Sequence, residues 1–471
     1  MSKYLYGASL QGLQEFIFQT NKLKEIIGAS EIIKKFDNWN LKEEFNLSKE
    51  PEIILQAAGN LRVIFDNEDD VKEIVLHLPK KIMQEAYGIS ISQGVVEYKN
   101  YKEDSPILEK NLKIQRNKKA IPLDFHLSAF QINPRTGLPA VKEAELDKSS
   151  FLDKSSSQKL KSYKKASEKD PTLKSLELEN KNKIKNKKNK IAIIHIDGNG
   201  LGEIVRKLDE KEMREFSQNL NEATNKAYDE ALKNKDSYKY PDDLSKIRKV
   251  ILGGDDLTLI CNANIALEFT QKFLCLFECK TKKIPTNIPT GGLTACAGIA
   301  YCNEKFPFFY AVKLADDLCT FAKKHSKEIN EKLPPSSLMF HNIRSSYVES
   351  FENFINDELR INGVHCDFGP YYLNSPNQPS IQSFLDLKND FKTENSPKGR
   401  LRDWLNILKK DKNIAERELN RIAEIFNPNK WESEHFEKLH KGLSLKKLII
   451  KVQSKEKTPI YDVLQILSVE D

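Results

Sequence analysis

Three aspartates occupy positions from which they could bind divalent cations. Asp197 ends a near-continuous apolar run at 191–196, which predicts a central strand covered on at least one face. Asp255 and Asp256 lie between two more apolar runs, which predicts a hairpin with both residues at its turn. Carboxylates crowded at one sheet edge repel one another, and hard cations such as Mg²⁺ or Mn²⁺ relieve that repulsion. Two such ions stabilise the attacking and leaving oxygens of an in-line displacement on a triphosphate.

Glycines beside these aspartates would let a ligand approach the backbone. Gly253 and Gly254 allow a tight hairpin turn, because they carry no Cβ. Gly198, Asn199 and Gly200 form a strand-to-helix junction, where backbone N–H groups offer a seat for phosphate. The chain contains no GxxxxGK[ST], so this is not a Walker loop.

A Gly-Gly-Asp-Asp segment between two strands is by itself most often a plain turn. The strand-end aspartate about 55 residues upstream, in the same order of elements, favours functional carboxylates. Lys323, on a predicted helix, could reach a triphosphate, although most helix lysines are only solvated. His195 lies in the buried strand and is expected to be a packed core histidine. No HExxH motif and no CxxC pair is present.

The predicted order of elements is the same in two parts of the chain. Each part follows the order β, α, β, β, α, β, which is the ferredoxin-like arrangement. We therefore expect an α+β protein with two ferredoxin-like domains and a helical C-terminal domain. The expected division is a first domain with a turn-rich appendage, a lysine-rich linker, a second domain with the Gly-Gly-Asp-Asp turn, and a helical domain, at residues 1–146, 147–190, 191–339 and 340–471.

Composition is that of a water-soluble protein, with 39% hydrophobic and 30% charged residues. The net charge of +7 is local, because residues 154–190 hold 13 lysines and four acidic residues, which leaves the remainder near −2. That segment is either a solvated linker or a non-specific contact for a phosphate backbone. We find no signal peptide and no apolar run long enough for a membrane span. The odd number of cysteines, seven with six of them between residues 261 and 319, favours reduced thiols and a cytoplasmic location.

The combination of these motifs resembles the large polymerase/cyclase subunit of type III CRISPR effector complexes, the Cas-ten (Cmr-two) family. Asp-Gly-Asn-Gly-Leu-Gly at 197–202, Gly-Gly-Asp-Asp at 253–256 and Ala-Lys at 322–323 are similar to its second palm domain. Residues 11–18 and 23–30 resemble the opening of its first palm. The first-palm turn at 56–60 lacks aspartates, so we expect that palm to be catalytically silent.

The resemblance implies an enzyme that joins or cyclises ATP into oligoadenylate second messengers for antiviral defence. It implies that Asp197 and Asp255 hold the metals, that Asp256 supports them, and that Gly253 and Gly254 line the nucleotide. Expected partners are a nucleoside triphosphate and, by the same resemblance, RNA and other effector subunits; a homodimer stays open.

Three departures from the family qualify this expectation. No HD nuclease domain precedes the first palm, so DNA cleavage is not expected. Cysteines of the family's zinc appendage are missing around 133–140. Asn199 stands where many members carry a second aspartate. Two alternatives remain: a non-catalytic nucleotide- or RNA-binding subunit of a ribonucleoprotein, and a diguanylate-cyclase-like enzyme. The preference for ATP comes from the resemblance alone.

Overall fold

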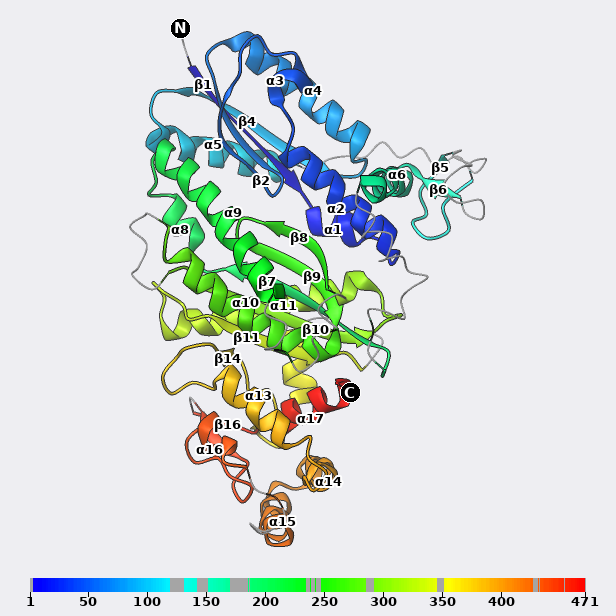
Figure 1. Ribbon diagram of the computed structural model, residues 1–471, viewed down its shortest axis with the longest axis vertical. Coiled ribbons are helices and arrows are strands. Elements are labelled where there is room, and N and C mark those ends of the chain that lie inside the picture. The colour runs from blue at the N-terminus through cyan, green and yellow to red at the C-terminus, as the bar shows by residue number, and fades with distance from the viewer. Residues whose placement is uncertain are drawn as a thin grey trace.

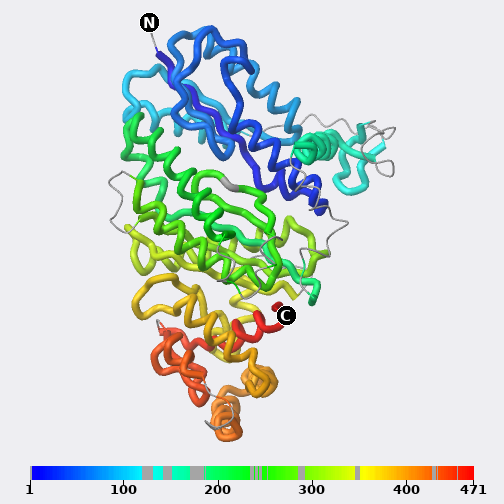
Figure 2. Tube along the Cα trace, viewed as in Figure 1, coloured from blue at the N-terminus to red at the C-terminus, as the bar shows by residue number. Residues whose placement is uncertain are grey.

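The computed structural model arranges the chain as three units along its long axis, with the N-terminal unit at one end and α14 and α15 at the other (Figures 1 and 2). The residues it describes are 3–118, 131–141, 151–169, 185, 187–233, 238, 242, 247–284, 292–344, 351–426, 431, 433–452 and 454–470.

The first unit is a four-stranded antiparallel sheet in the order β2-β3-β1-β4. This is the strand order of a ferredoxin-like fold and confirms the predicted arrangement. Its elements are β1 (Lys3–Gln11), α1 (Leu13–Phe18), α2 (Leu23–Asp37), α3 (Leu41–Phe45), β2 (Glu52–Ala57), β3 (Asn60–Phe65), α4 (Glu68–Glu85), β4 (Ser90–Tyr98) and α5 (Tyr101–Arg116).

Helix α5 was not predicted from the sequence. It packs closely on β1 and β4, because a Cβ on Gly7 would lie 2.8 Å from Cδ2 of Leu108, and one on Gly94 3.3 Å from Cδ1 of the same leucine. The buried side of the helix includes Leu108 and Leu112.

Part of the predicted lysine-rich linker is a packed helix. Helix α6 (Lys154–Lys169) lies against α2, and a Cβ on Gly28 would fall 1.8 Å from the Lys159 carbonyl oxygen. The Lys159 side chain is buried and donates to the Phe16 carbonyl at 2.6 Å. A solvated linker is therefore the wrong description of this part, since Tyr163 of α6 lies in the same buried cluster as Ile26 of α2.

The appendage predicted at 120–145 is described only at 131–141. There β5 (Ala140–Val141) pairs with β6 (Leu152–Asp153), and the buried Asp153 carboxylate accepts from Asn133 at 2.6 Å and from Thr136 at 2.8 Å. The other residues of the predicted appendage, and residues 170–184 of the predicted linker, lie outside the described part of the chain.

The second unit repeats the ferredoxin-like order and extends it. Strands β10-β7-β9-β8 form the antiparallel core, and β11 and β14 continue the sheet beyond β10. Its elements are β7 (Lys190–Gly198), α8 (Leu201–Val205), α9 (Glu210–Lys233), β8 (Arg248–Gly253), β9 (Asp256–Asn262), α10 (Ala266–Thr281), β10 (Ala295–Asn303), α11 (Phe308–Ile329) and β11 (Ser337–Asn342).

Alternate residues of β7 belong to two different cores. Ile194 and Ile196 join the core that contains residues of α9 and α10, whereas Ile191 and Ile193 join the core that contains α11 and α2. This alternation follows from the two-residue period of a strand. It places His195 and Asp197 on the sheet face that α11 covers, toward the first unit.

The C-terminal part is mostly helical, as predicted, but it also contains strands. β14 (Tyr371–Tyr372) pairs with β11, and a separate sheet has the order β12-β13-β16-β15. The predicted boundary at 339/340 falls inside β11, so the second sheet continues past it. The remaining elements are α12 (Phe351–Phe354), β12 (Arg360–Ile361), β13 (Val364–His365), α13 (Ile381–Asp390), α14 (Lys398–Lys410), α15 (Lys412–Ile425), α16 (His435–Leu439), β15 (Ile450–Val452), β16 (Lys455–Lys457) and α17 (Ile460–Val469).

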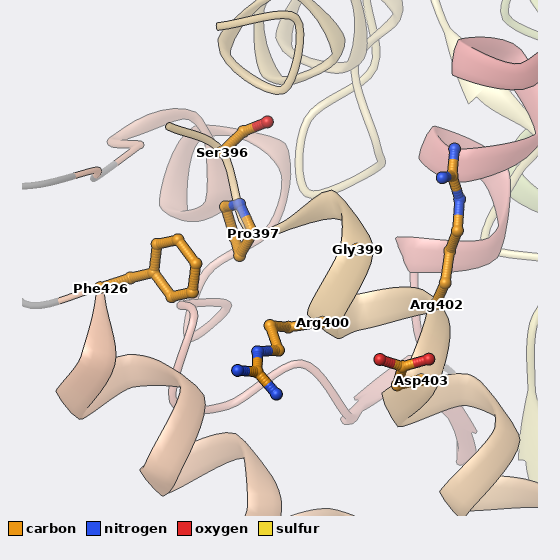
Figure 3. Close-up of a pocket in the computed structure, with 7 residues that line it drawn as sticks. All are labelled: Ser396, Pro397, Gly399, Arg400, Arg402, Asp403 and Phe426. Carbon is orange, nitrogen blue, oxygen red and sulfur yellow. The ribbon is translucent and has the colours of Figure 1, made fainter. Parts of the chain in front are cut away.

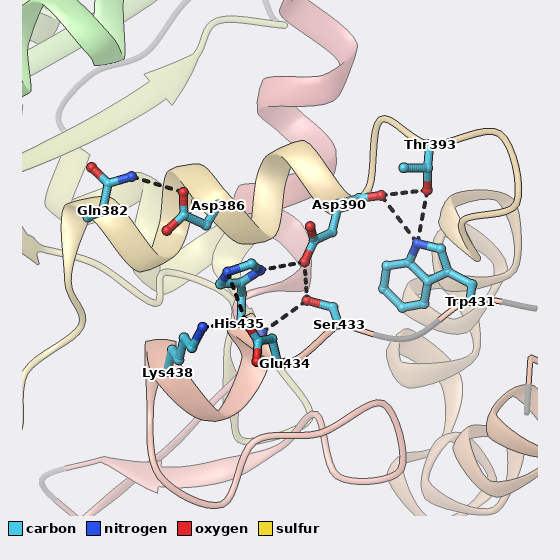
Figure 4. Close-up of polar contacts among 9 residues, drawn as sticks. All are labelled: Gln382, Asp386, Asp390, Thr393, Trp431, Ser433, Glu434, His435 and Lys438. Carbon is cyan, nitrogen blue, oxygen red and sulfur yellow. Dashed lines mark hydrogen bonds and ion pairs between the residues drawn. The ribbon is translucent and has the colours of Figure 1, made fainter. Parts of the chain in front are cut away.

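Polar contacts at the end of α13 hold the C-terminal unit together (Figure 4). Asp390 accepts from His435 Nδ1 at 2.7 Å and from the Ser433 hydroxyl, while the Trp431 indole donates to the Asp390 carbonyl at 3.2 Å. The Ser433 hydroxyl donates to the aspartate and accepts from the His435 backbone N–H at 3.2 Å, but it does not bond to the His435 ring, so the three groups do not form a serine-type catalytic relay.

Within the described ranges, no helix combines the length and the apolar character that a bilayer crossing requires.

Candidate active site

The sheet of the second unit brings Asp197 and Asp256 to one edge. Ile196 pairs with Leu257 across β7 and β9, so the next step of that register sets Asp197 opposite Asp256. Gly253 pairs with Asp256 across the hairpin, which makes Gly254 and Asp255 its two turn residues. Directly opposed residues share a sheet face.

Asp255 lies directly beside the end of β7. Its carboxyl is within hydrogen-bonding reach of Asp197, and a Cβ on Gly198 would fall 2.8 Å from Asp255 Oδ2. Gly198 is therefore required for this close approach. Burial, followed by the charge of Asp197, raises the pKa of Asp255 to about 7. Burial and the same neighbour raise the pKa of Asp256 well above its ordinary value.

Lys323 of α11 contacts the end of β7 from above the sheet. Its ammonium group forms an ion pair with Asp197 Oδ2 and donates to the Gly198 carbonyl at 2.8 Å. Burial disfavours the charged amine, but Asp197 outweighs it and the pKa of Lys323 is raised. The structure thus places the predicted lysine together with the predicted aspartates.

His195 and Asp316 extend this polar group. The His195 ring is only 4% exposed; its Nδ1 lies 3.0 Å from Thr258 Oγ1 and 3.5 Å from Asp256 Oδ1, and its Nε2 lies 3.3 Å from Asp316 Oδ1. Burial lowers the pKa of His195, against the attraction of Asp316. His195 is buried as predicted, but it connects two carboxylates and is not a purely packed side chain.

Sequence reasoning overlooked Asp316. It precedes Lys323 by seven residues on α11, and two helical turns return a side chain to the same face of a helix. That spacing is a signal that could have placed both residues over the sheet edge.

The Asn199 side chain is directed to the start of β10 and β11, not to the aspartates. Its Nδ2 donates to Thr294 Oγ1 at 3.1 Å and approaches the Pro334 carbonyl at 3.4 Å, and its own N–H donates to the Thr294 carbonyl at 2.8 Å. The residue is 5% exposed. This geometry supports a role in fixing the strand end, and it offers no support for the predicted contact with nucleotide.

The predicted glycines hold the two turns open. Gly200 and Gly254 have φ of +71° and +61°, and a Cβ on either would meet no atom within 4 Å. Both therefore suit the left-handed backbone and leave space above it. The Gly254 carbonyl accepts from Thr224 Oγ1 of α9 at 2.6 Å, which fixes the hairpin turn from one side.

The donors fit a magnesium-type ion that arrives with a triphosphate. Among the residues that the structure describes, no three or more His, Cys, Asp or Glu side chains are arranged to hold a metal by themselves. Mg²⁺ ordinarily takes one or two carboxylates and completes its shell with phosphate oxygens and water. Apart from the His195 ring at 3.5 Å, the buried Asp256 Oδ1 has no hydrogen-bond partner among the described residues, which leaves it available to a ligand from outside the chain.

Comparison with known proteins places this site in a family. Residues 190–331 match the family model described as Cas10/Cmr2, second palm domain. No curated protein matches the chain significantly. Nearly the whole chain superposes on solved Csm1 structures: the Csm1-Csm4 cassette with one ATP (TM-score 0.56, 13% identity, 100% of this chain, 70% of that chain), the same cassette with cA4 (0.53, 14%, 99% and 69%), and Csm1 in T.onnurineus (0.55, 13%, 100% and 70%).

At this level of identity the solved structures establish the fold, while the family match covers the segment that carries the aspartates. Residues 190–331 are therefore similar to the second palm domain of the Cas10/Cmr2 family, and the chain as a whole shares its fold with the solved Csm1 structures.

Proposed function

We propose that this protein is a palm-type nucleotidyl transferase that uses ATP and divalent cations to make cyclic or linear oligoadenylates in type III CRISPR defence. The observation that carries the proposal is the meeting of Asp197, Asp255 and Lys323 at one sheet edge. The fold is that of a Csm1 solved with ATP in one case and with cA4 in another, which supports the choice of substrate and product.

Asp197, Asp255 and Asp256 would hold the cations, and the cations would neutralise the negative charge of the triphosphate oxygens. Lys323 would move its ammonium from Asp197 to a phosphate oxygen once cations occupy the carboxylates. The protein backbone at the Gly254 turn would contact the nucleotide directly, since no side chain blocks the approach. His195 would hold Asp256 in place from the buried side through its contact with that carboxylate.

Mass spectrometry of products from ATP and Mg²⁺, with and without a candidate activating RNA, tests the proposal. Wild-type protein should convert ATP, and Asp255→Ala with Asp256→Ala should abolish conversion. Asp229→Ala, an exposed aspartate of α9 in the same unit, is the matched control and should behave as wild type. Product formation that survives the double substitution would remove both aspartates from the mechanism.

One observation favours a second candidate, a nucleotide- or RNA-binding subunit without turnover. The Lys323 ammonium forms an ion pair with Asp197, the carboxylate that a cation would need. RNA that co-purifies at moderate salt, with no ATP conversion under any condition, would favour this candidate. Stronger binding and conversion of GTP than of ATP would instead favour a diguanylate-cyclase-like enzyme. The Csm4 found beside Csm1 supports a further effector subunit as a partner.

A further inference from the structure

The turn between β2 and β3 of the first unit is held in a costly conformation. Ala58 has φ of +49°, a left-handed backbone that residues other than glycine rarely adopt, and Gly59 has φ of +74°. Such conformations persist only where the surroundings enforce them, and they concentrate at functional sites.

Asp37 supplies that enforcement. One carboxylate oxygen accepts from the Ala58 N–H at 3.0 Å and the other from the Gly59 N–H at 2.9 Å. Asp37 is the last residue of α2, where a negative charge opposes the helix dipole. Burial raises the pKa of Asp37 to about 6, and the two amides act in the opposite direction. The Asp37 carboxylate is thus in an unfavourable place for a negative charge, and there it stabilises the unfavourable backbone conformation of the Ala58–Gly59 turn.

The clamped turn lies against the Gly-Gly-Asp-Asp hairpin of the second unit. A Cβ on Gly253 would fall 3.2 Å from the Ala58 Cβ, so the two turns are in direct contact. Helix α2 reaches the same hairpin a second time, because the Ser30 hydroxyl donates to the Val250 carbonyl. Thr224 holds the hairpin from α9 through Gly254. The first unit and α9 therefore both contact the hairpin.

We infer that Asp37 is a positioning residue for the catalytic hairpin: by clamping the Ala58–Gly59 turn, it keeps Gly253 and the two following aspartates in register with Asp197. A first palm without aspartates of its own would thus still serve the second. Misplacement of a reacting group by about 1 Å can cost on the order of 100-fold in rate. The kinetic consequence rests on the proposed function, whereas the mechanical coupling does not.

The test joins hydrogen–deuterium exchange with kinetics on the full chain. In Asp37→Ala, amides of residues 253–256 should exchange at least about tenfold faster without nucleotide, and kcat for ATP conversion should fall about tenfold or more. Asp69→Ala, whose side chain is 96% exposed on α4, is the matched control and should change neither.

Unchanged exchange and kcat in a folded Asp37→Ala protein would overturn the inference. If that variant does not fold, Asp37→Asn, which keeps one acceptor oxygen, carries the same two measurements. A wild-type protein that makes no product while Asp37→Ala loosens residues 253–256 would refute the proposed function and leave the mechanical coupling standing.

Discussion

The largely buried Lys323 side chain forms an ion pair with Asp197. Removing it should therefore weaken the binding of the triphosphate. Lys323→Ala should raise KM for ATP by about 10- to 100-fold, because a hydrogen bond to a charged group contributes about 1.5–3 kcal/mol. Steady-state kinetics at saturating Mg²⁺ measure the effect. Lys324→Ala is the matched control, since its ammonium pairs with Glu352 at 2.9 Å on the exposed side of α11.

Equal KM values for the two variants would exclude Lys323 from triphosphate binding. A rise in KM for Lys323→Ala alone would agree with a Lys323 ammonium that exchanges its ion pair with Asp197 for one with a phosphate oxygen when the nucleotide binds.

Asn199 lies in the sequence motif that contains Asp197, but its side chain is directed to Thr294 and not to the aspartates. Asn199→Asp would restore the aspartate common in the family, but it would lose the donor to Thr294 and bury a charge. We expect a loss of about 1–3 kcal/mol in the free energy of unfolding, measured by urea denaturation. Asn420→Asp, exposed on α15, should cost little. An Asn199→Asp protein that keeps its stability and binds Mn²⁺ more tightly would contradict this expectation and show that a carboxylate at position 199 can reach the metal site.

At the scale of elements, α11 can carry Lys323 to the sheet edge only because Gly298 of β10 lacks a side chain. A Cβ there would lie 1.9 Å from the Ala315 carbonyl and 2.5 Å from the Cys319 nitrogen. Gly298→Ala should therefore displace α11, lower the free energy of unfolding by about 1–3 kcal/mol, and reduce ATP conversion. Gly399→Ala, where a Cβ meets nothing within 4 Å, is the control for both measurements. Gly399 lines a surface pocket of the C-terminal unit together with Arg400 and Phe426 (Figure 3).

Periodicity in the sequence was enough to predict both ferredoxin-like sheets, because alternating and helical apolar patterns report burial directly. It could not predict α5. The packing of this helix depends on Gly7 and Gly94, and glycines do not contribute to a pattern of apolar side chains. Nor could it show that α6 is folded, since its lysines look solvated until Lys159 meets the Phe16 carbonyl. Asp316 was overlooked for a similar reason, because its partner His195 comes from another element.

His341 gives β11 a dependence on pH. Burial lowers the pKa of His341 to about 3 from the ordinary 6.5, and its ring packs on Phe354 at a centroid distance of 4.4 Å. A depressed histidine pKa contributes stability above about pH 6.5, and this is lost as pH falls toward 3. Each pH unit in that window removes up to about 1.4 kcal/mol. Thermal unfolding midpoints between pH 7.5 and 5 should therefore fall less steeply in His341→Gln than in wild type; equal slopes would refute the assignment.

For the whole molecule, the two palm-like units share their cores. One buried cluster contains Ile26 of α2 together with Ile193 of β7 and Val250 of β8. Residues that pack in one core unfold together, so we expect the two units to melt in a single calorimetric transition. Ile26→Ala should cost about 2–5 kcal/mol and speed the exchange of β7 amides, although the substitution lies in the other unit.

Ile414→Ala is the control for that prediction, because its side chain is 53% exposed on α15 and should leave β7 unchanged. Two separate transitions, with Ile26→Ala lowering only one and leaving β7 exchange as in wild type, would show that the units unfold independently. The shared cores also give the first unit a structural role, because its α2 face, through Ser30 and the Ala58 turn, contacts the hairpin that carries Asp255.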